Sequence, residues 1–318
     1  MTDLAAAPSS PDPELRCATW TKAQGVDPIG SAGRFDALLL VEWPVPWPAD
    51  VSDIPALAPA SGDPRARLMT VVPRTDDGEA DGLTRVVHHR RVRTNHLAGV
   101  DHRVAQAEVP ELLGQLLNAI DTDTSDWPSA VGLAPAEVLV CAHGRRDPCC
   151  GRWGTLLHME LAARSTDVRV WRCSHTGGHR FAPTAITFPE GRAWAYVDAD
   201  LLEGVVARSG DLHELLPHDR GTTALDMWAQ VVERAVFERI GWAWLNHNLT
   251  AAHTAVAEDG GSAQVHLAWR APDGTLGTAI GTVEVTRIMP VLVCGQPPEA
   301  AKKSSPELAL REVHITIG

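Results

Sequence analysis

The chain has 318 residues, a formal net charge of −12 and 44% hydrophobic residues, which suits two globular domains with a sizeable core. The acidic balance argues against nucleic acid and anionic membrane surfaces, because both need a basic footprint. No run approaches 18 apolar residues, and the N-terminus lacks the basic and apolar regions of a signal peptide. We therefore expect a cytoplasmic protein with no nucleic-acid or membrane partner, in which clustered cysteines are metal ligands or catalytic groups.

The first half of the chain predicts an α/β domain. Residues 1–15 are rich in Ala, Pro, Ser and Asp, so we expect a disordered tail. Apolar runs predict strands, and one run with apolar residues every three or four positions predicts a helix. The predicted strands are 35–43, 67–73 and 83–93, the predicted helix is 108–120, and the basic cluster His88, His89, Arg90 and Arg91 is expected at a solvated strand end.

An acidic, Thr-rich stretch at 121–128 marks the predicted boundary between an N-terminal domain (16–128) and a C-terminal domain (129–318). The second domain alternates apolar runs with one strong helical pattern at 222–240, for which Thr222 or Thr223 is the expected cap. The Pro/Lys/Ser-rich residues 296–310 are expected to be a loop. The other predicted elements are a helix at 155–164 and strands at 137–141, 168–172, 184–188, 193–197, 264–269 and 282–285.

One stretch, residues 141–183, holds four of the six cysteines and four of the fourteen histidines. Cys141 and Cys150 follow one predicted strand, and His175 and His179 follow the next. Thiolate and imidazole suit both zinc and iron–sulfur centres. The eight residues between the cysteines exceed the spacing of a zinc knuckle and favour a larger two-iron cluster. Two glycines between the histidines permit positive φ, so a tight loop can turn both rings to one point.

The blocks C-A-H-G-R-R-D-P-C-C-G at 141–151 and H-T-G-G-H-R-F-A-P at 175–183 resemble the sucrase/ferredoxin-like family. Weaker similarity extends to C-A-T-W at 17–20 and to L-L-V-E-W-P-V-P-W at 39–47. The resemblance implies an α/β fold with a thioredoxin-like mixed sheet flanked by helices, and we expect two thioredoxin-like halves packed together. It also implies that Pro183 is the proline, usually cis, that opens the hairpin facing the site. The cluster ligands that it implies are Cys141, Cys150, His175 and His179, bound to a [2Fe-2S] cluster.

Such a cluster would be neutral when oxidised, because two ferric ions are balanced by two sulfides and two thiolates. Reduction is then easier than in a four-cysteine centre, and two-histidine Rieske centres span about −150 to +300 mV against about −400 mV for plant-type ferredoxins. We expect a one-electron carrier that serves a redox partner protein which the sequence does not identify. Proton-coupled electron transfer is a further hypothesis. Arg145, Arg146 and Arg180 are candidates for hydrogen bonds to sulfur or for partner docking.

Alternatives remain open at this stage. Cys149 could replace Cys150, and a Rieske-like set of Cys141, His143, Cys173 and His175 is a further ligand set. A thiol-based redox protein or a structural zinc module on the same fold are the alternative functions, although the loop lacks the C-x-x-C of thioredoxin chemistry. No carboxylate pair suggests a sugar hydrolase. The remaining candidates are given structural roles: Asp147 in holding Arg145 or the loop, His143 as a supporting donor or loop residue, His158 as a surface or packed histidine, and Cys17 and Cys294 as free thiols.

Overall fold

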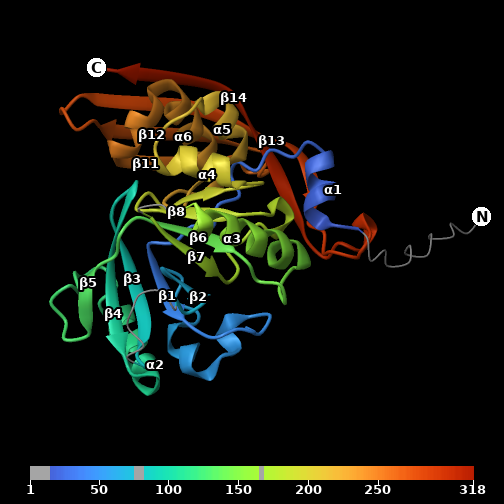
Figure 1. Ribbon diagram of the computed structural model, residues 1–318. Coiled ribbons are helices and arrows are strands. Elements are labelled where there is room, and N and C mark those ends of the chain that lie inside the picture. Colours follow the sequence, from blue (N-terminus) through green and yellow to red (C-terminus); the bar gives the residue numbers. More distant parts are fainter. Residues whose placement is uncertain (1–14, 75–81, 165–167) are drawn as a thin grey trace, which may run out of the picture.

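The structure is a computed structural model that describes residues 15–74, 82–164 and 168–318. The tail predicted at 1–15 therefore lies, except for its last residue, outside the described residues. Those residues form a ten-stranded mixed sheet and a four-stranded antiparallel sheet, with helices packed against both (Figure 1). The mixed α/β class expected from the sequence is confirmed. In the described ranges no helix has the length and hydropathy needed to cross a membrane.

The large sheet is built from two halves with the same strand order. The first half runs β2-β1-β3-β4-β5 and the second β7-β6-β8-β9-β10. In each half the first two strands are parallel and the third is antiparallel to the first. The strands of the first half are β1 (Ala37–Glu42), β2 (Ala66–Val71), β3 (Thr84–Arg93), β4 (His96–Val104) and β5 (Ala130–Leu133), with helix α2 (Val109–Asn118) after β4.

The second half carries the Cys/His stretch. Helix α3 (Thr155–Ala163) connects its two parallel strands, and α4 (Ala199–Val206) follows its hairpin. Asp198 caps α4 by accepting a hydrogen bond from the Leu201 backbone N–H. The strands are β6 (Glu137–Cys141), β7 (Arg169–Cys173), β8 (Ala185–Phe188), β9 (Arg192–Trp194) and β10 (Asp219–Thr222). Every one of the strands predicted between 137 and 197 is present, within a few residues at its ends.

The two halves meet at one edge and also face to face. Val71 of β2 and Cys173 of β7 are the residue pair that joins their edges. The rings of His89 on β3 and Phe188 on β8 lie 4.6 Å apart although four strands separate β3 from β8 in the sheet order. One buried apolar layer, with residues of both halves, fills the space between them. The loops that follow β1, β6 and β7 therefore gather at one end of the molecule.

The C-terminal sheet is larger than the sequence predicted. Its strands are β11 (Asn248–Val256), β12 (Ser262–Arg270), β13 (Leu276–Pro290) and β14 (Ser304–Ile317). The expected loop at 296–310 is wrong from residue 304 onward, because β14 pairs with β13 along its whole length. Few β14 side chains are buried, so its strand state comes from this long-range pairing and not from an apolar pattern. Helix α6 (Met227–Ile240) fills the space between this sheet and the large one (Figure 1).

Two local expectations need correction. The cap of α6 is Asp226, whose carboxylate accepts hydrogen bonds from the backbone N–H groups of Trp228 and Ala229, because Thr222 belongs to strand β10. His88 and His89 do not lie at a solvated strand end, since both side chains are buried between the layers. The imidazole of His88 contacts the Thr124 hydroxyl at 3.3 Å.

Replacing His88 by Leu is expected to make stability less sensitive to acid. Burial, and then the neighbouring His102 and His89, lower the pKa of His88 from 6.5 to about 4. Below pH 6.5 the unfolded chain therefore binds a proton at His88 that the folded chain does not bind. The free energy of unfolding decreases as the pH falls from 6.5 toward 4. Relative to pH 7.5, the wild type should lose about 2 kcal/mol more than His88→Leu at pH 5.

Denaturant unfolding of both proteins at the two pH values measures this difference. His253→Leu, which removes an exposed histidine of β11, is the matched control and should keep the pH dependence of the wild type. Equal acid sensitivity of His88→Leu and the wild type would contradict the prediction.

Candidate metal centre

Cys141 and Cys150 lie on either side of a tight loop that starts where β6 ends. Cys150 begins a short π-helical turn (Cys150–Gly154) that continues into α3. The turn packs directly on the strand, because a Cβ at Gly154 would lie 1.8 Å from the Cys141 carbonyl oxygen. Only glycine permits this approach, which draws the second cysteine back beside the first.

His175 and His179 lie on the loop after β7, next to β6 in the sheet. The glycines between them adopt the left-handed backbone that the sequence predicted, with φ of 85° at Gly177 and 66° at Gly178. A Cβ at Gly178 would also lie 2.4 Å from the Arg220 guanidinium. The Ala182–Pro183 peptide bond that closes this loop is cis, as the family resemblance implied.

The two loops bring three of the four predicted ligands into contact. Cys150 and His175 both interact with the Cys141 thiol. His179 lies next to His175, with ring centroids 6.2 Å apart, and its Nδ1 faces Asp147 at 2.9 Å and the Cys17 sulfur at 3.6 Å. The role of the four residues as ligands stays a prediction.

The neighbouring cysteines Cys149 and Cys150 face different partners. Cys150 lies against Cys141, whereas the Cys149 sulfur lies 3.1 Å from Cys294 and 3.9 Å from Cys17. Between the two alternatives left open by the sequence, this arrangement favours Cys150 as the partner of Cys141.

Asp147 ties the two loops together. Its Oδ2 lies 2.9 Å from His179 Nδ1, while its Oδ1 accepts hydrogen bonds from the backbone N–H groups of Cys149 at 2.9 Å and Cys150 at 3.3 Å. The expected role in holding the cysteine loop is confirmed, and the same carboxylate also fixes the His179 ring. With Nδ1 held in this way, Nε2 is the ring nitrogen left for a metal.

The site is buried, yet it stabilises negative charge. The hydrogen bond from Cys150, and then His175, bring the pKa of the Cys141 thiol well below 9.0 although burial opposes them. The same hydrogen bond raises the pKa of Cys150. Two guanidinium groups hold the histidine loop: the partly buried Arg67 donates to the His175 carbonyl at 2.6 Å, and the buried Arg220 donates to the Gly177 carbonyl at 3.0 Å. Both lie close enough to attract the Cys141 thiolate.

The donor set suits a soft or borderline metal centre. Nδ1 of His175 is buried and has no hydrogen-bond partner, which is costly unless another group binds it. An iron–sulfur cluster or a zinc ion held by Cys141, Cys150 and the two histidines would satisfy this nitrogen and the buried thiols.

The other candidates from the sequence serve the surroundings of the site. His143 Nε2 lies 2.8 Å from the Pro48 carbonyl of the loop after β1, and its ring packs edge-on against Trp47. Cys173 is fully buried beside Cys141 in the sheet. Arg146 is exposed near Asp50, whereas the Arg180 guanidinium is buried against Phe181. Partner docking by the exposed arginines stays a prediction.

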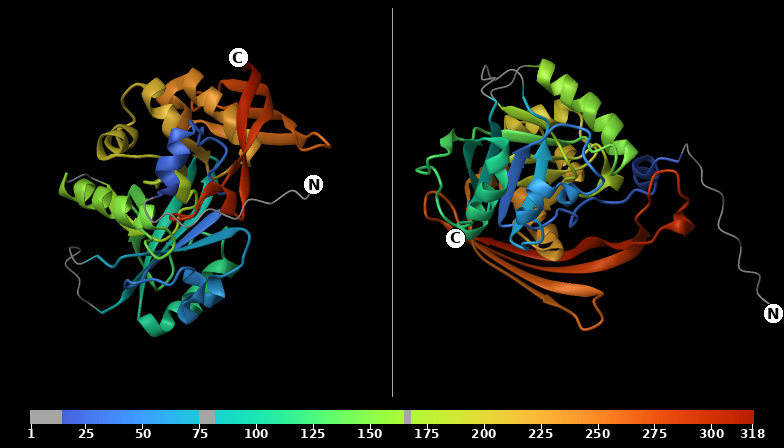
Figure 2. Two further views of the ribbon diagram at one scale, coloured as in Figure 1. Left: turned by 90° about the vertical axis from the view of Figure 1, so that its right-hand side faces the viewer. Right: turned by 90° about the horizontal axis from the view of Figure 1, so that it is seen from below.

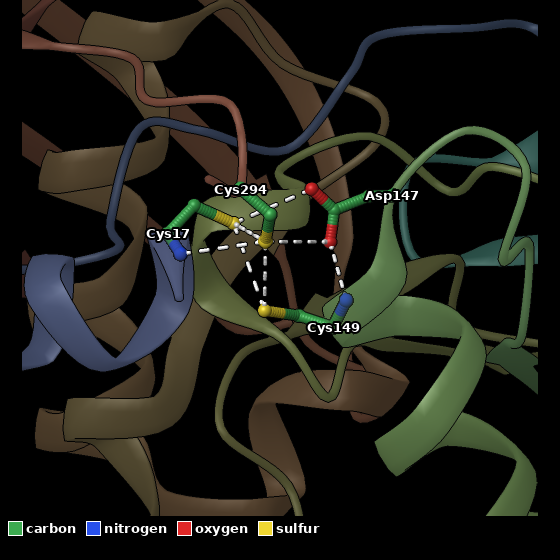
Figure 3. A group of neighbouring side chains, drawn as sticks. All are labelled: Cys17, Asp147, Cys149 and Cys294. Carbon is green, nitrogen blue, oxygen red and sulfur yellow. Dashed lines mark hydrogen bonds between the residues drawn. The ribbon is translucent and has the colours of Figure 1, made fainter. Parts of the chain in front are cut away.

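The sequence missed a second group of donors beside this site. Cys17, Cys149, Cys294 and Asp147 each offer a ligand atom, and these atoms all lie within 4.8 Å of one another, so the group could hold a metal ion (Figure 3). Hydrogen bonds from Cys149 and Cys17 lower the pKa of the Cys294 thiol to about 2. Cys17 and Cys294 are free thiols, as expected. Cys17 and Cys294 are 277 positions apart in the sequence, so their proximity is a long-range feature. The only sequence signal for it was the weak family similarity of C-A-T-W at 17–20.

Comparison with known proteins agrees with these features. The family model described as "Sucrase/ferredoxin-like" matches residues 28–221, which include both loops of the site. A curated relative, "Altered inheritance of mitochondria protein 32" of Meyerozyma guilliermondii, is 33% identical over an alignment of 89 residues, and the match covers 22% of this chain and 32% of that protein. The chain thus matches about a third of the length of this relative, and no solved structure matches it. Since the family model covers more than half of the sequence, the chain belongs to the sucrase/ferredoxin-like family.

Proposed function

We propose that the protein is an electron carrier with a [2Fe-2S] cluster on Cys141, Cys150, His175 and His179. The observation that carries this proposal is the contact of the Cys141 thiol with Cys150 and His175, with His179 next to His175, at the ends of adjacent parallel strands in a member of the sucrase/ferredoxin-like family. When bound, the cluster would supply one-electron redox chemistry at a potential raised by its two neutral ligands.

The protein contributes charge and position. Asp147 orients His179, and the guanidinium groups of Arg67 and Arg220 fix the backbone of the histidine loop. These cations favour any added negative charge, so they should raise the potential further. Cys141 and Cys150 are inaccessible, whereas the His179 side chain is 21% exposed. We infer that electrons enter and leave on the histidine side, where a redox partner protein would dock.

The fold supports this function if each half is a thioredoxin-like unit. The repeated order, with two parallel strands, an antiparallel third and fourth strand, and a helix after them, is the plan of the thioredoxin core. In this proposal residues 16–128 are a degenerate copy without ligands, and 129–318 are the ferredoxin domain with a C-terminal extension. Strand β5, at Ala130–Leu133, pairs with β4, which favours a boundary a few residues later than residue 128. The free state of all six cysteines suits the cytoplasm, where we propose that the protein resides.

Neither alternative function explains the site as well. A thiol oxidoreductase needs an accessible thiolate, and Cys141 and Cys150 are both buried. A zinc ion at the same four ligands would hold the loops together. Zinc has no redox chemistry, so the effect of two neutral histidine ligands on a reduction potential would then serve no purpose.

Iron content separates the two adjacent cysteines. Protein purified without oxygen should contain about two iron atoms and two acid-labile sulfides per chain, with a visible absorbance and an EPR signal after reduction. Cys150→Ser should lose most of the iron because it removes a ligand. Cys149→Ser is the matched control and should retain it, since Cys149 faces Cys294. Zinc in place of iron at these four residues, or iron loss confined to Cys149→Ser, would contradict the proposal.

Proton coupling is a separate prediction, tested by redox titration between pH 6 and 10. If an imidazole N–H proton of a ligand histidine is released on oxidation, the midpoint potential should fall by about 59 mV per pH unit over part of this range. His179→Cys replaces a neutral ligand by a thiolate, so its potential should be lower and less dependent on pH. A midpoint potential that stays constant across the range would rule out proton coupling.

A further inference from the structure

The second donor group joins three segments that are distant in the sequence. Cys17 is the first residue of helix α1 (Cys17–Ala23), Cys149 lies in the cysteine loop, and Cys294 lies in the connection between β13 and β14. Cys17 and Cys149 are 132 positions apart, and Cys149 and Cys294 are 145 apart. Figures 1 and 2 show α1 (blue) beside the β13–β14 connection (red), and the Leu15 carbonyl accepts a hydrogen bond from the Gly295 backbone N–H.

The spacing of the donors is that of a single tetrahedral ion. The three sulfur–sulfur distances are 3.1 Å, 3.4 Å and 3.9 Å, and Asp147 oxygens lie 3.4 Å from Cys17 and 3.9 Å from Cys294. A tetrahedron with zinc–sulfur bonds of about 2.3 Å has edges of about 3.8 Å. A multi-iron cluster would hold its cysteines farther apart, because metal ions and sulfides lie between them.

Two backbone N–H groups point at sulfurs of the group. The backbone N–H of Cys17 points at the Cys294 sulfur at 3.5 Å, and that of Ala18 hydrogen-bonds to Cys149. Cys17, Cys149 and Asp147 are buried, and Cys294 is partly exposed. Thiolates at all three cysteines, together with the Asp147 carboxylate, would repel one another strongly in so small a buried volume. A divalent cation that prefers thiolate ligands would remove this repulsion.

We propose that Cys17, Cys149, Cys294 and Asp147 bind one Zn²⁺ ion as a closed structural site beside the [2Fe-2S] ligands. Three sulfurs and one carboxylate oxygen fill the four positions that structural zinc uses. Cys17 and Cys294 both lie outside residues 28–221, so the region matched by the family model supplies only Cys149 and Asp147 to this site. The inference does not depend on the electron-transfer function.

The ion would act as a clamp. It would fasten α1 and the β13–β14 connection to the cysteine loop, where Ala18 and Leu292 already pack against Cys141 and Cys150. Asp147 would bind the ion and still hold His179, so the clamp and the histidine loop would be mechanically joined. Because the linked segments are so far apart in sequence, zinc binding would add directly to the free energy of folding.

Separate counts of zinc and iron test the site. Protein purified without oxygen and dialysed against EDTA should contain about one zinc per chain. Cys17→Ala and Cys294→Ala should each lower zinc to less than about a fifth of this amount, because a ligand is lost, with iron unchanged. Cys173→Ala is the matched control, since it removes a buried cysteine outside the group, and it should keep both metals.

A spectroscopic measurement on the unmodified sequence guards against variants that fail to fold. Zinc-free wild-type protein given Co²⁺ should show the thiolate-to-cobalt charge-transfer and intense d–d bands of a tetrahedral site, and X-ray absorption at the zinc edge should show about three sulfur neighbours. The inference would be overturned if the protein contained no zinc and gave no cobalt bands. Zinc retained in Cys294→Ala would also overturn it, and so would a Cys149–Cys294 disulfide in the anaerobic protein. Zinc without iron would support this site and contradict the proposed function, and iron without zinc would do the reverse.

Discussion

The carboxylate of Asp147 is the contact on which the arrangement of the centre depends. It is buried, and it accepts hydrogen bonds from the backbone of the cysteine loop on one side while it holds the His179 ring on the other. These two loops leave neighbouring strands of the same sheet, and the contact keeps them in a fixed relation. A change at Asp147 would therefore disturb the cysteine loop and the histidine loop together, because the two oxygens of this one carboxylate make the hydrogen bonds to both loops.

Charge balance explains why so polar a centre can be buried. The thiolate of Cys141 lies near the guanidinium groups of Arg67 and Arg220, neither of which forms an ion pair with a carboxylate among the described residues. Burial, and then the neighbouring Arg67 and Arg180, lower the pKa of Arg220 to about 10, which is still far above neutral, so the cation persists. The backbone carbonyls of the histidine loop bind these cations. The fold therefore supplies positive charge in advance, and the cost of burying the thiolate is reduced.

The sequence predicted local features well and long-range ones poorly. The apolar runs placed β6 and β7, and the glycines at 177–178 and the proline at 183 indicated the histidine loop because backbone geometry leaves a local trace. The burial of His88, the strand state of Ser304–Ile317 and the meeting of Cys17 with Cys294 left no such trace. Each depends on a partner more than a dozen residues away in the sequence, and neither the hydrophobic periodicity nor the composition identifies that partner.

The same distinction separates the two metal-binding groups. The four residues of the proposed cluster come from two short loops, so a single half of the large sheet is enough to assemble them. The Cys17, Cys149 and Cys294 group needs the N-terminal helix, the central loop and the C-terminal extension in place at once. It can form only when the whole chain has folded, and it then lies directly against the histidine loop, because the Cys17 sulfur is 3.6 Å from His179 Nδ1. Completion of the fold is thus linked to the histidine loop through Cys17 and Asp147.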